Sequence, residues 1–135
     1  MVIDASATLV WCFQDEIGEA DLHLLDRLRS ERIDVPGLWL LELANALALA
    51  ERKRRITAAD TAGFLSLLEQ LDIDVHAETW RDVFSTILPL SRAQTLTAYD
   101  AAYLDLAMRL GVPLASKDRA LCAAAERVGV EVVAV

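Results

Sequence analysis

The amino-acid sequence predicts an α/β protein with three layers, α/β/α, around a central, mainly parallel sheet of four to five short strands. Two observations predict this class. Short apolar segments alternate with longer stretches of helical periodicity, and strands joined through helices pair in parallel because the connection has to cross the sheet. The 135 residues contain no linker rich in Pro, Gly or Ser, so we expect a single domain, residues 1–135.

The predicted elements follow one another as strand and helix from the first residues onward. The predicted strands, which are short and apolar, are Val2-Ile3, Ile33 to Pro36, Ile73 to Val75, Val112 to Ala115 and Glu131 to Val135. The predicted helices are Ala5 to Phe13, Ala20 to Arg29, Leu38 to Arg54, Thr61 to Leu71, Glu78 to Leu88, Thr97 to Leu110 and Arg119 to Val128. We expect the first helix to be entered through Ser6 or Thr8, both good N-cap residues.

Local signals set several of these boundaries. Leu38 to Arg54 carries alanine and leucine on nearly every face, which predicts a largely buried helix up to its basic end. Thr57 and Asp60 form a capping box before the next helix. We expect Pro89 to end the helix that precedes it and Gly111 to close the helix before the fourth strand.

Charge and cysteine content narrow the function classes. The formal net charge of −8 argues against broad electrostatic binding of nucleic acid, so a phosphate substrate needs bound cations or the local basic run Arg52 to Arg55. Cys12 and Cys122 match no metal-ligand spacing, which favours a reduced, cytoplasmic protein. The longest apolar stretch, Leu38 to Ala50, includes Glu42 and is too short for a membrane span.

Four carboxylates stand beside hydrophobic segments: Asp4, Glu42, Asp100 and Asp118. Asp4 and Asp118 follow predicted strands, at the edge where parallel sheets place their ligands. Taken singly, Asp4, Asp100 and Asp118 are also ordinary helix-start residues. Glu42 has no capping role and is surrounded by leucine and alanine, so it needs a salt bridge or a polar cleft.

Other polar and aromatic side chains are weaker candidates. His23 and His76 do not have the spacing of metal ligands. Asp105 lies roughly 140° around the predicted helix from Asp100, so it should face a different environment. We expect the three tryptophans to pack in the core or at an interface rather than to stack on nucleobases; they are Trp11, Trp39 and Trp80.

Four segments together resemble the PIN-domain ribonucleases, and among them the VapC toxins of bacterial type II toxin–antitoxin systems. They are Val2-Ile3-Asp4-Ala5-Ser6, Val35-Pro36 with Leu40 to Leu47, Thr97 to Ala107, and Leu114 to Asp118 with Leu121. The resemblance covers essentially the whole chain in order, while Glu51 to Arg92 matches weakly.

The resemblance implies a metal-dependent endoribonuclease. It assigns Asp4, Glu42, Asp100 and Asp118 to Mg²⁺ or Mn²⁺ binding and catalysis, supported by the hydroxyls of Ser6 and Ser116. It further implies a homodimer, an RNA substrate with tRNA among the candidates, and a VapB-like antitoxin whose C-terminal segment lies over the active site.

Three other functions remain as alternatives. A phosphoacceptor signalling domain fits poorly because no adjacent acidic pair follows the first strand, and a haloacid-type phosphatase because Ser6 stands where its second aspartate belongs. The third alternative is a catalytically inactive PIN fold that only binds RNA or protein.

Overall fold

The computed structural model describes residues 1–135 and contains one sheet of five parallel strands in the order β3-β2-β1-β4-β5. The strands are β1 (Val2–Ile3), β2 (Ile33–Pro36), β3 (Ile73–His76), β4 (Leu114–Ala115) and β5 (Val132–Val133). Central β1 pairs on both sides, since Val2 is in register with Asp34 and with Leu114. The predicted fold class is therefore confirmed, with every strand parallel.

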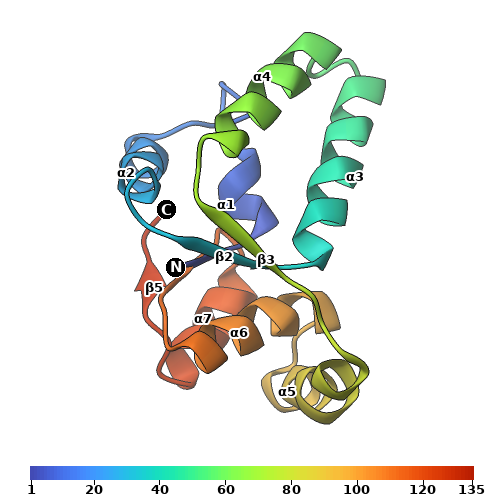
Figure 1. Ribbon diagram of the computed structural model, residues 1–135, viewed down its shortest axis with the longest axis vertical. Coiled ribbons are helices and arrows are strands. Elements are labelled where there is room, and N and C mark those ends of the chain that lie inside the picture. Colours follow the sequence, from blue (N-terminus) through green and yellow to red (C-terminus); the bar gives the residue numbers. More distant parts are fainter.

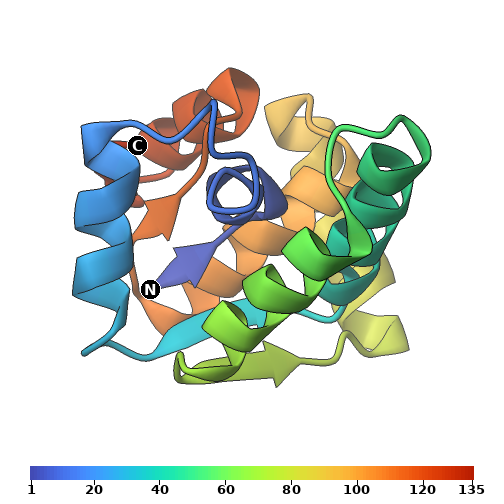
Figure 2. The same ribbon diagram turned by 90° about the horizontal axis from the view of Figure 1, so that it is seen from above.

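Helices cover both faces of this sheet. They are α1 (Ala5–Leu9), α2 (Glu19–Leu28), α3 (Leu38–Arg52), α4 (Ala58–Glu69), α5 (Leu88–Gln94), α6 (Ala98–Leu110) and α7 (Arg119–Arg127), with a π-helical segment, η1 (Asp82–Ile87), before α5. In Figure 1, α1, α3 and α4 lie on one side of the strands and α6 and α7 on the other. Figure 2, seen from above, shows α1 nearly end-on above β1, with α2 to one side and α3 and α4 to the other.

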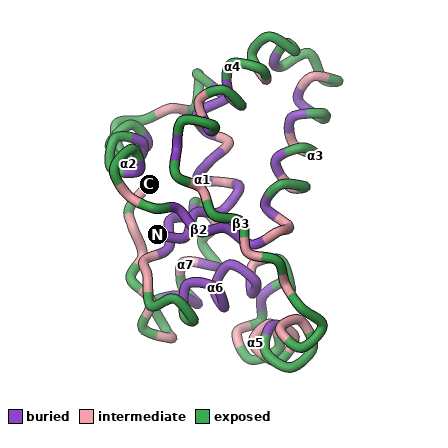
Figure 3. Tube along the Cα trace, in the orientation of Figure 1, coloured by how far each residue is buried: buried purple, intermediate pink, exposed green.

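Helix α6 is the most buried helix and lies against the centre of the sheet. Every residue from Ala101 to Ala107 is buried, and Figure 3 shows α6 as a buried segment while much of α3, α4 and α5 is exposed. Gly111 ends α6 in the left-handed conformation with φ 63°, as expected from the sequence. The buried part of α6 therefore packs against β1, β2 and β4 at the centre of the sheet.

Several sequence expectations were wrong. Helix α1 ends at Leu9 rather than Phe13, and its N-cap is Asp4 rather than Ser6 or Thr8. Helix α3 is not largely buried, because Leu40 is 51% and Leu41 75% exposed. Its alanines and leucines lie all round the helix, but only the Trp39, Leu43 and Leu47 face meets the core.

Pro89 does not end a helix. The chain runs from η1 directly into α5, with Ile87 and Leu88 both in the helical conformation, so Pro89 lies within a continuous helix, just after the wider π-helical turn. No helix in the structure combines the length and apolar character needed to cross a membrane.

Candidate metal centre

Asp4 follows β1 directly and is the most buried of the four predicted acids, at 4% exposure. Its Oδ1 accepts hydrogen bonds from the Ala7 amide at 2.9 Å and from the Ser6 hydroxyl at 2.7 Å. Its Oδ2 accepts from the Ser116 hydroxyl at 2.5 Å. Asp4 is thus both the helix cap and the centre of a hydroxyl network, two roles that the sequence analysis had treated as alternatives.

The two serines connect Asp4 to Asp118. The Asp118 amide donates to the Ser116 hydroxyl at 2.9 Å, and the Lys117 amide donates to the Ser6 hydroxyl at 2.9 Å. Asp118 also caps α7, where its Oδ1 accepts from the Leu121 amide at 2.8 Å. The loop after β4 is therefore fixed against the start of α1, which holds Asp4 and Asp118 in one place.

Glu42 lies in the second turn of α3, and its Oε1 accepts a hydrogen bond from the Tyr103 hydroxyl at 2.5 Å. Burial raises the pKa of Glu42, the Tyr103 hydrogen bond lowers it, and the negative charge of Asp4 raises it again. The two side chains come from different helices, 61 residues apart in sequence. The sequence analysis missed Tyr103; its position three residues after Asp100, on the same helical face, is the signal that could have found it.

Asp100 occupies the first turn of α6, where Thr97 caps the helix by accepting from the Asp100 amide at 3.1 Å. Burial and the charges of Asp118, Asp4 and Glu42, in that order, raise the pKa of Asp100 to about 6. Burial likewise raises the pKa of Asp4, against hydrogen bonds from Ser116, Ala7 and Ser6 that lower it. The four carboxylates are therefore close enough to repel one another. We call Asp4, Glu42, Asp100 and Asp118 the acidic edge.

No positively charged side chain compensates the acidic edge. None of its four members takes part in an ion pair. Lys117, although next to Asp118 in sequence, directs its ammonium to Asp21 Oδ1 at 2.7 Å. Oxygen ligands carrying uncompensated negative charge are what a hard cation such as Mg²⁺ or Mn²⁺ binds, usually with some waters retained. The acidic edge fits such an ion.

A second group of potential ligands lies on the neighbouring strands β2 and β3. One ligand atom each from Asp34, Asp74 and His76 lies within 4.8 Å of the others, and no three members of the acidic edge meet that distance. Arg32, however, forms ion pairs with both aspartates, and the Met1 ammonium lies 4.0 Å from Asp34.

We call Asp34, Asp74, His76 and Arg32 the β2–β3 cluster. His76 Nε2 lies 2.8 Å from Asp34 Oδ1, so His76 has polar partners although the sequence showed it as a lone histidine. The signal that the sequence offered was the repeated pattern Ile33-Asp34-Val35 and Ile73-Asp74-Val75, which places both aspartates in register. Arg32 and the Met1 ammonium together balance the negative charges of the two aspartates, so the cluster needs no metal ion for that purpose.

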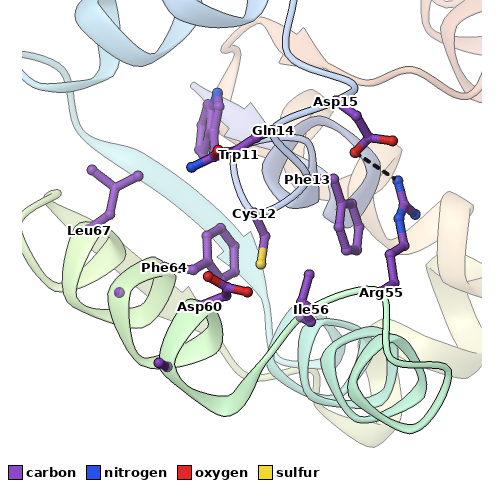
Figure 4. A pocket seen from close by; sticks show the side chains of 12 residues that line it. Trp11, Cys12, Phe13, Gln14, Asp15, Arg55, Ile56, Asp60, Phe64 and Leu67 are labelled. Atoms are coloured by element: carbon purple, nitrogen blue, oxygen red, sulfur yellow. Dashed lines mark ion pairs between the residues drawn. The ribbon is translucent and has the colours of Figure 1, made fainter.

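Other predicted positions lie away from the acidic edge. Asp105 is buried and pairs with Arg109 at 3.0 Å, and Trp11 and Trp39 are buried, whereas Trp80 is 80% exposed. A cavity of about 540 Å³ lies between the end of α1 and α4 (Figure 4). There Arg55 lies 3.9 Å from the centre of the Phe13 ring and pairs with Asp15. None of the four acids lines this cavity.

The comparisons with known proteins agree with this architecture. A family model described as "PIN domain" matches residues 1–127, and the chain belongs to the PIN domain family. It is also similar to a solved structure, PAE2754 from Pyrobaculum aerophilum, with a TM-score of 0.70 and 25% identity over 98% of this chain and 82% of that one. The search of curated proteins found no match. PIN domains are generally metal-dependent nucleases, so the chain has a nuclease fold.

Proposed function

We propose that this protein is a Mg²⁺- or Mn²⁺-dependent endoribonuclease and acts as a VapC-type toxin. One observation supports the catalytic part above all others: four carboxylates from four separate elements gather at one edge of the sheet without a single cationic partner. Clustering like charges destabilises a fold unless a cation is bound. Such a cluster therefore supports a cation-binding role more strongly than a structural one.

The residues of the acidic edge have distinct tasks in this proposal. The bound cation neutralises phosphate charge and makes a water molecule a better nucleophile. Asp4, Glu42 and Asp100 hold the cation directly or through water, and Asp118 completes the site or orients the attacking water. Ser6 and Ser116 keep the Asp4 carboxylate in position through the hydrogen bonds described above.

The partners of the proposed toxin rest on the resemblance to VapC proteins. We propose a homodimer and a VapB-like antitoxin that covers the acidic edge, in the cytoplasm. An apolar groove of about 550 Å³ lies between α3 and α4, and α3 carries both one wall of this groove and Glu42. An antitoxin segment bound in the groove would contact the helix that carries Glu42, on the face opposite to that carboxylate.

The direct test is RNA cleavage by purified protein. Total RNA and tRNA are incubated with wild type, Asp4→Ala and Asp100→Asn in the presence of Mg²⁺, Mn²⁺ or EDTA. We expect specific cuts by the wild type with either metal, none in EDTA, and none by the variants. Equal cleavage by wild type and variants would mean a contaminating nuclease and would overturn the assignment.

Two further outcomes separate the remaining alternatives. Metal binding without cleavage of any RNA would favour the PIN fold as a binding module. Growth arrest on expression, relieved by Asp100→Asn and by co-expression of a small protein encoded next to this chain, would support the toxin role. Expression without any effect on growth would count against it.

A further inference from the structure

Tyr103 joins the two sides of the acidic edge. It lies in the buried part of α6, three residues after Asp100, and is 1% exposed. Residues at this spacing leave a helix on the same face, so the phenol lies on the side of α6 that carries Asp100. Its hydroxyl donates to Glu42 Oε1 at 2.5 Å, and the backbone N–H of Ala5, at the start of α1, faces the phenol oxygen. The hydroxyl thus joins α6 to the carboxylate of α3.

The orientation of the Glu42 carboxylate depends on this one contact. Asp4 accepts three hydrogen bonds, whereas Glu42 accepts only the bond from Tyr103, much as Asp118 accepts only the bond from the Leu121 amide. Glutamate also has one more rotatable bond than aspartate, and fixing it costs more conformational entropy. Without Tyr103, several orientations would be open to the half-buried Glu42 side chain.

The bond leaves Glu42 able to bind a cation. A carboxylate offers about four lone-pair sites over its two oxygens, and the phenol uses one of them on Oε1. The other oxygen has no hydrogen-bond donor in the structure. Groups that orient a metal ligand in this way typically change metal affinity or activity by about 10- to 100-fold when removed.

We propose that Tyr103 is a positioning residue for the metal centre, whose hydroxyl fixes the Glu42 carboxylate in the orientation that binds the divalent cation. The proposal rests on the proposed function, since it requires the acidic edge to bind a metal. A positioning role of Tyr103 can be told apart from a packing role. Packing depends on the aromatic ring, which phenylalanine keeps, whereas positioning depends on the hydroxyl group alone.

The test compares Tyr103→Phe with Tyr99→Phe, a matched control on the same helix whose side chain is 65% exposed and makes no hydrogen bond in the structure. Mn²⁺ affinity is measured by calorimetry, and thermal stability is measured in EDTA. We expect Tyr103→Phe to weaken Mn²⁺ binding by about 10-fold or more, with little change in melting temperature without metal. Tyr99→Phe should bind Mn²⁺ like the wild type.

A double-mutant cycle with Glu42→Ala shows whether Tyr103 acts through Glu42. Once Glu42 is removed, Tyr103→Phe should have no further effect on Mn²⁺ affinity, since coupled residues are not additive. In cleavage assays, Tyr103→Phe should lower kcat and leave the KM for RNA nearly unchanged.

The outcomes keep the two proposals apart. Wild-type affinity in Tyr103→Phe, or an equal loss with and without Glu42, would overturn the positioning role while the proposed function stands. Mn²⁺ binding that depends on Tyr103 in a protein that cuts no RNA would overturn the nuclease assignment alone. A wild type that binds no Mn²⁺ would overturn both.

Discussion

The acidic edge and the β2–β3 cluster both gather carboxylates, yet they are built in opposite ways. In the β2–β3 cluster, Arg32 pairs with Asp34 and Asp74, and His76 lies between them. In the acidic edge, the carboxylates are held by neutral donors, namely serine and tyrosine hydroxyls and backbone amides. The negative charge of the β2–β3 cluster is therefore balanced by cationic groups of the chain, whereas that of the acidic edge is not.

The comparison shows that short distances between ligand atoms do not identify a metal site by themselves. The β2–β3 cluster has its ligand atoms closer together, but its charge is already compensated. The acidic edge is more open, and its mutual repulsion contributes to the raised pKa of Asp100. Because neutral donors orient carboxylates without neutralising them, they preserve the negative charge that attracts a cation.

The largest expected effect is on catalysis. Asp100→Asn removes one charge from the acidic edge at nearly constant volume, and Asp74→Asn makes the same change in the β2–β3 cluster. We expect Asp100→Asn to lower kcat by at least about 100-fold, since even the partners of metal ligands contribute 10- to 100-fold. Asp74→Asn should cleave RNA at the wild-type rate. Comparable losses in both variants would remove the distinction between the two regions.

The next effect is on the pH dependence of metal binding. The pKa of Asp100 is raised to about 6, so a proton competes with the cation below that pH. We expect Mn²⁺ affinity to fall about 10-fold per pH unit below pH 6, as displacement of one proton requires. Calorimetry from pH 5 to 7.5 measures this slope, and Asp100→Asn should flatten it. A constant affinity over this range would contradict the assignment of Asp100.

The same shift predicts how stability without metal depends on pH. The folded state holds the Asp100 proton more tightly than the unfolded chain, because its pKa in the folded state is the higher one. The stabilising contribution is therefore present below about pH 4 and is lost as the pH rises towards 6. In EDTA, Asp100→Asn should remove this decline from the urea unfolding curves. A decline of the same size in the variant would assign it to other groups.

A smaller effect is expected at Ser116, whose hydroxyl donates to Asp4 and accepts from the Asp118 amide. Ser116→Ala breaks both contacts without changing any charge. We expect Mn²⁺ affinity to fall by about 10-fold, less than for loss of a carboxylate. Mn²⁺ titration by calorimetry measures the effect. Ser85→Ala, at an exposed position of η1, is the matched control and should bind like the wild type.

The smallest effect should come from replacing Arg32, and it tests whether charge balance is what distinguishes the β2–β3 cluster from the acidic edge. Arg32→Ala leaves Asp34 and Asp74 without their main cationic partner. We expect a lower urea midpoint and a second, weak Mn²⁺ binding event in calorimetry, because the cluster then resembles the acidic edge in charge. An unchanged midpoint with a single binding event would show that charge balance is not what separates the two clusters.

The sequence predicted the sheet and the position of each acid because both depend on local patterns. Short, mostly apolar segments of two to five residues identified all five strands, and helix-start signals placed Asp100 and Asp118 correctly. The exposed face of α3 was not predictable, since alanine and leucine lie on every side of that helix and only the tertiary fold decides which side is covered. The spacing of Tyr103 from Asp100 shows which face of the helix it occupies, but its contact with Glu42 joins residues 61 apart, and no local pattern shows such a pair.

The central claim is that the acidic edge, and not the β2–β3 cluster, binds a divalent cation. Calorimetric titration of Mn²⁺ into wild type, Asp4→Asn/Asp100→Asn and Asp34→Asn/Asp74→Asn tests it most directly, with folding checked by circular dichroism. We predict binding by the wild type and by the β2–β3 variant, and no binding by the acidic-edge variant. Binding that survives in the acidic-edge variant and disappears in the β2–β3 variant would contradict the account.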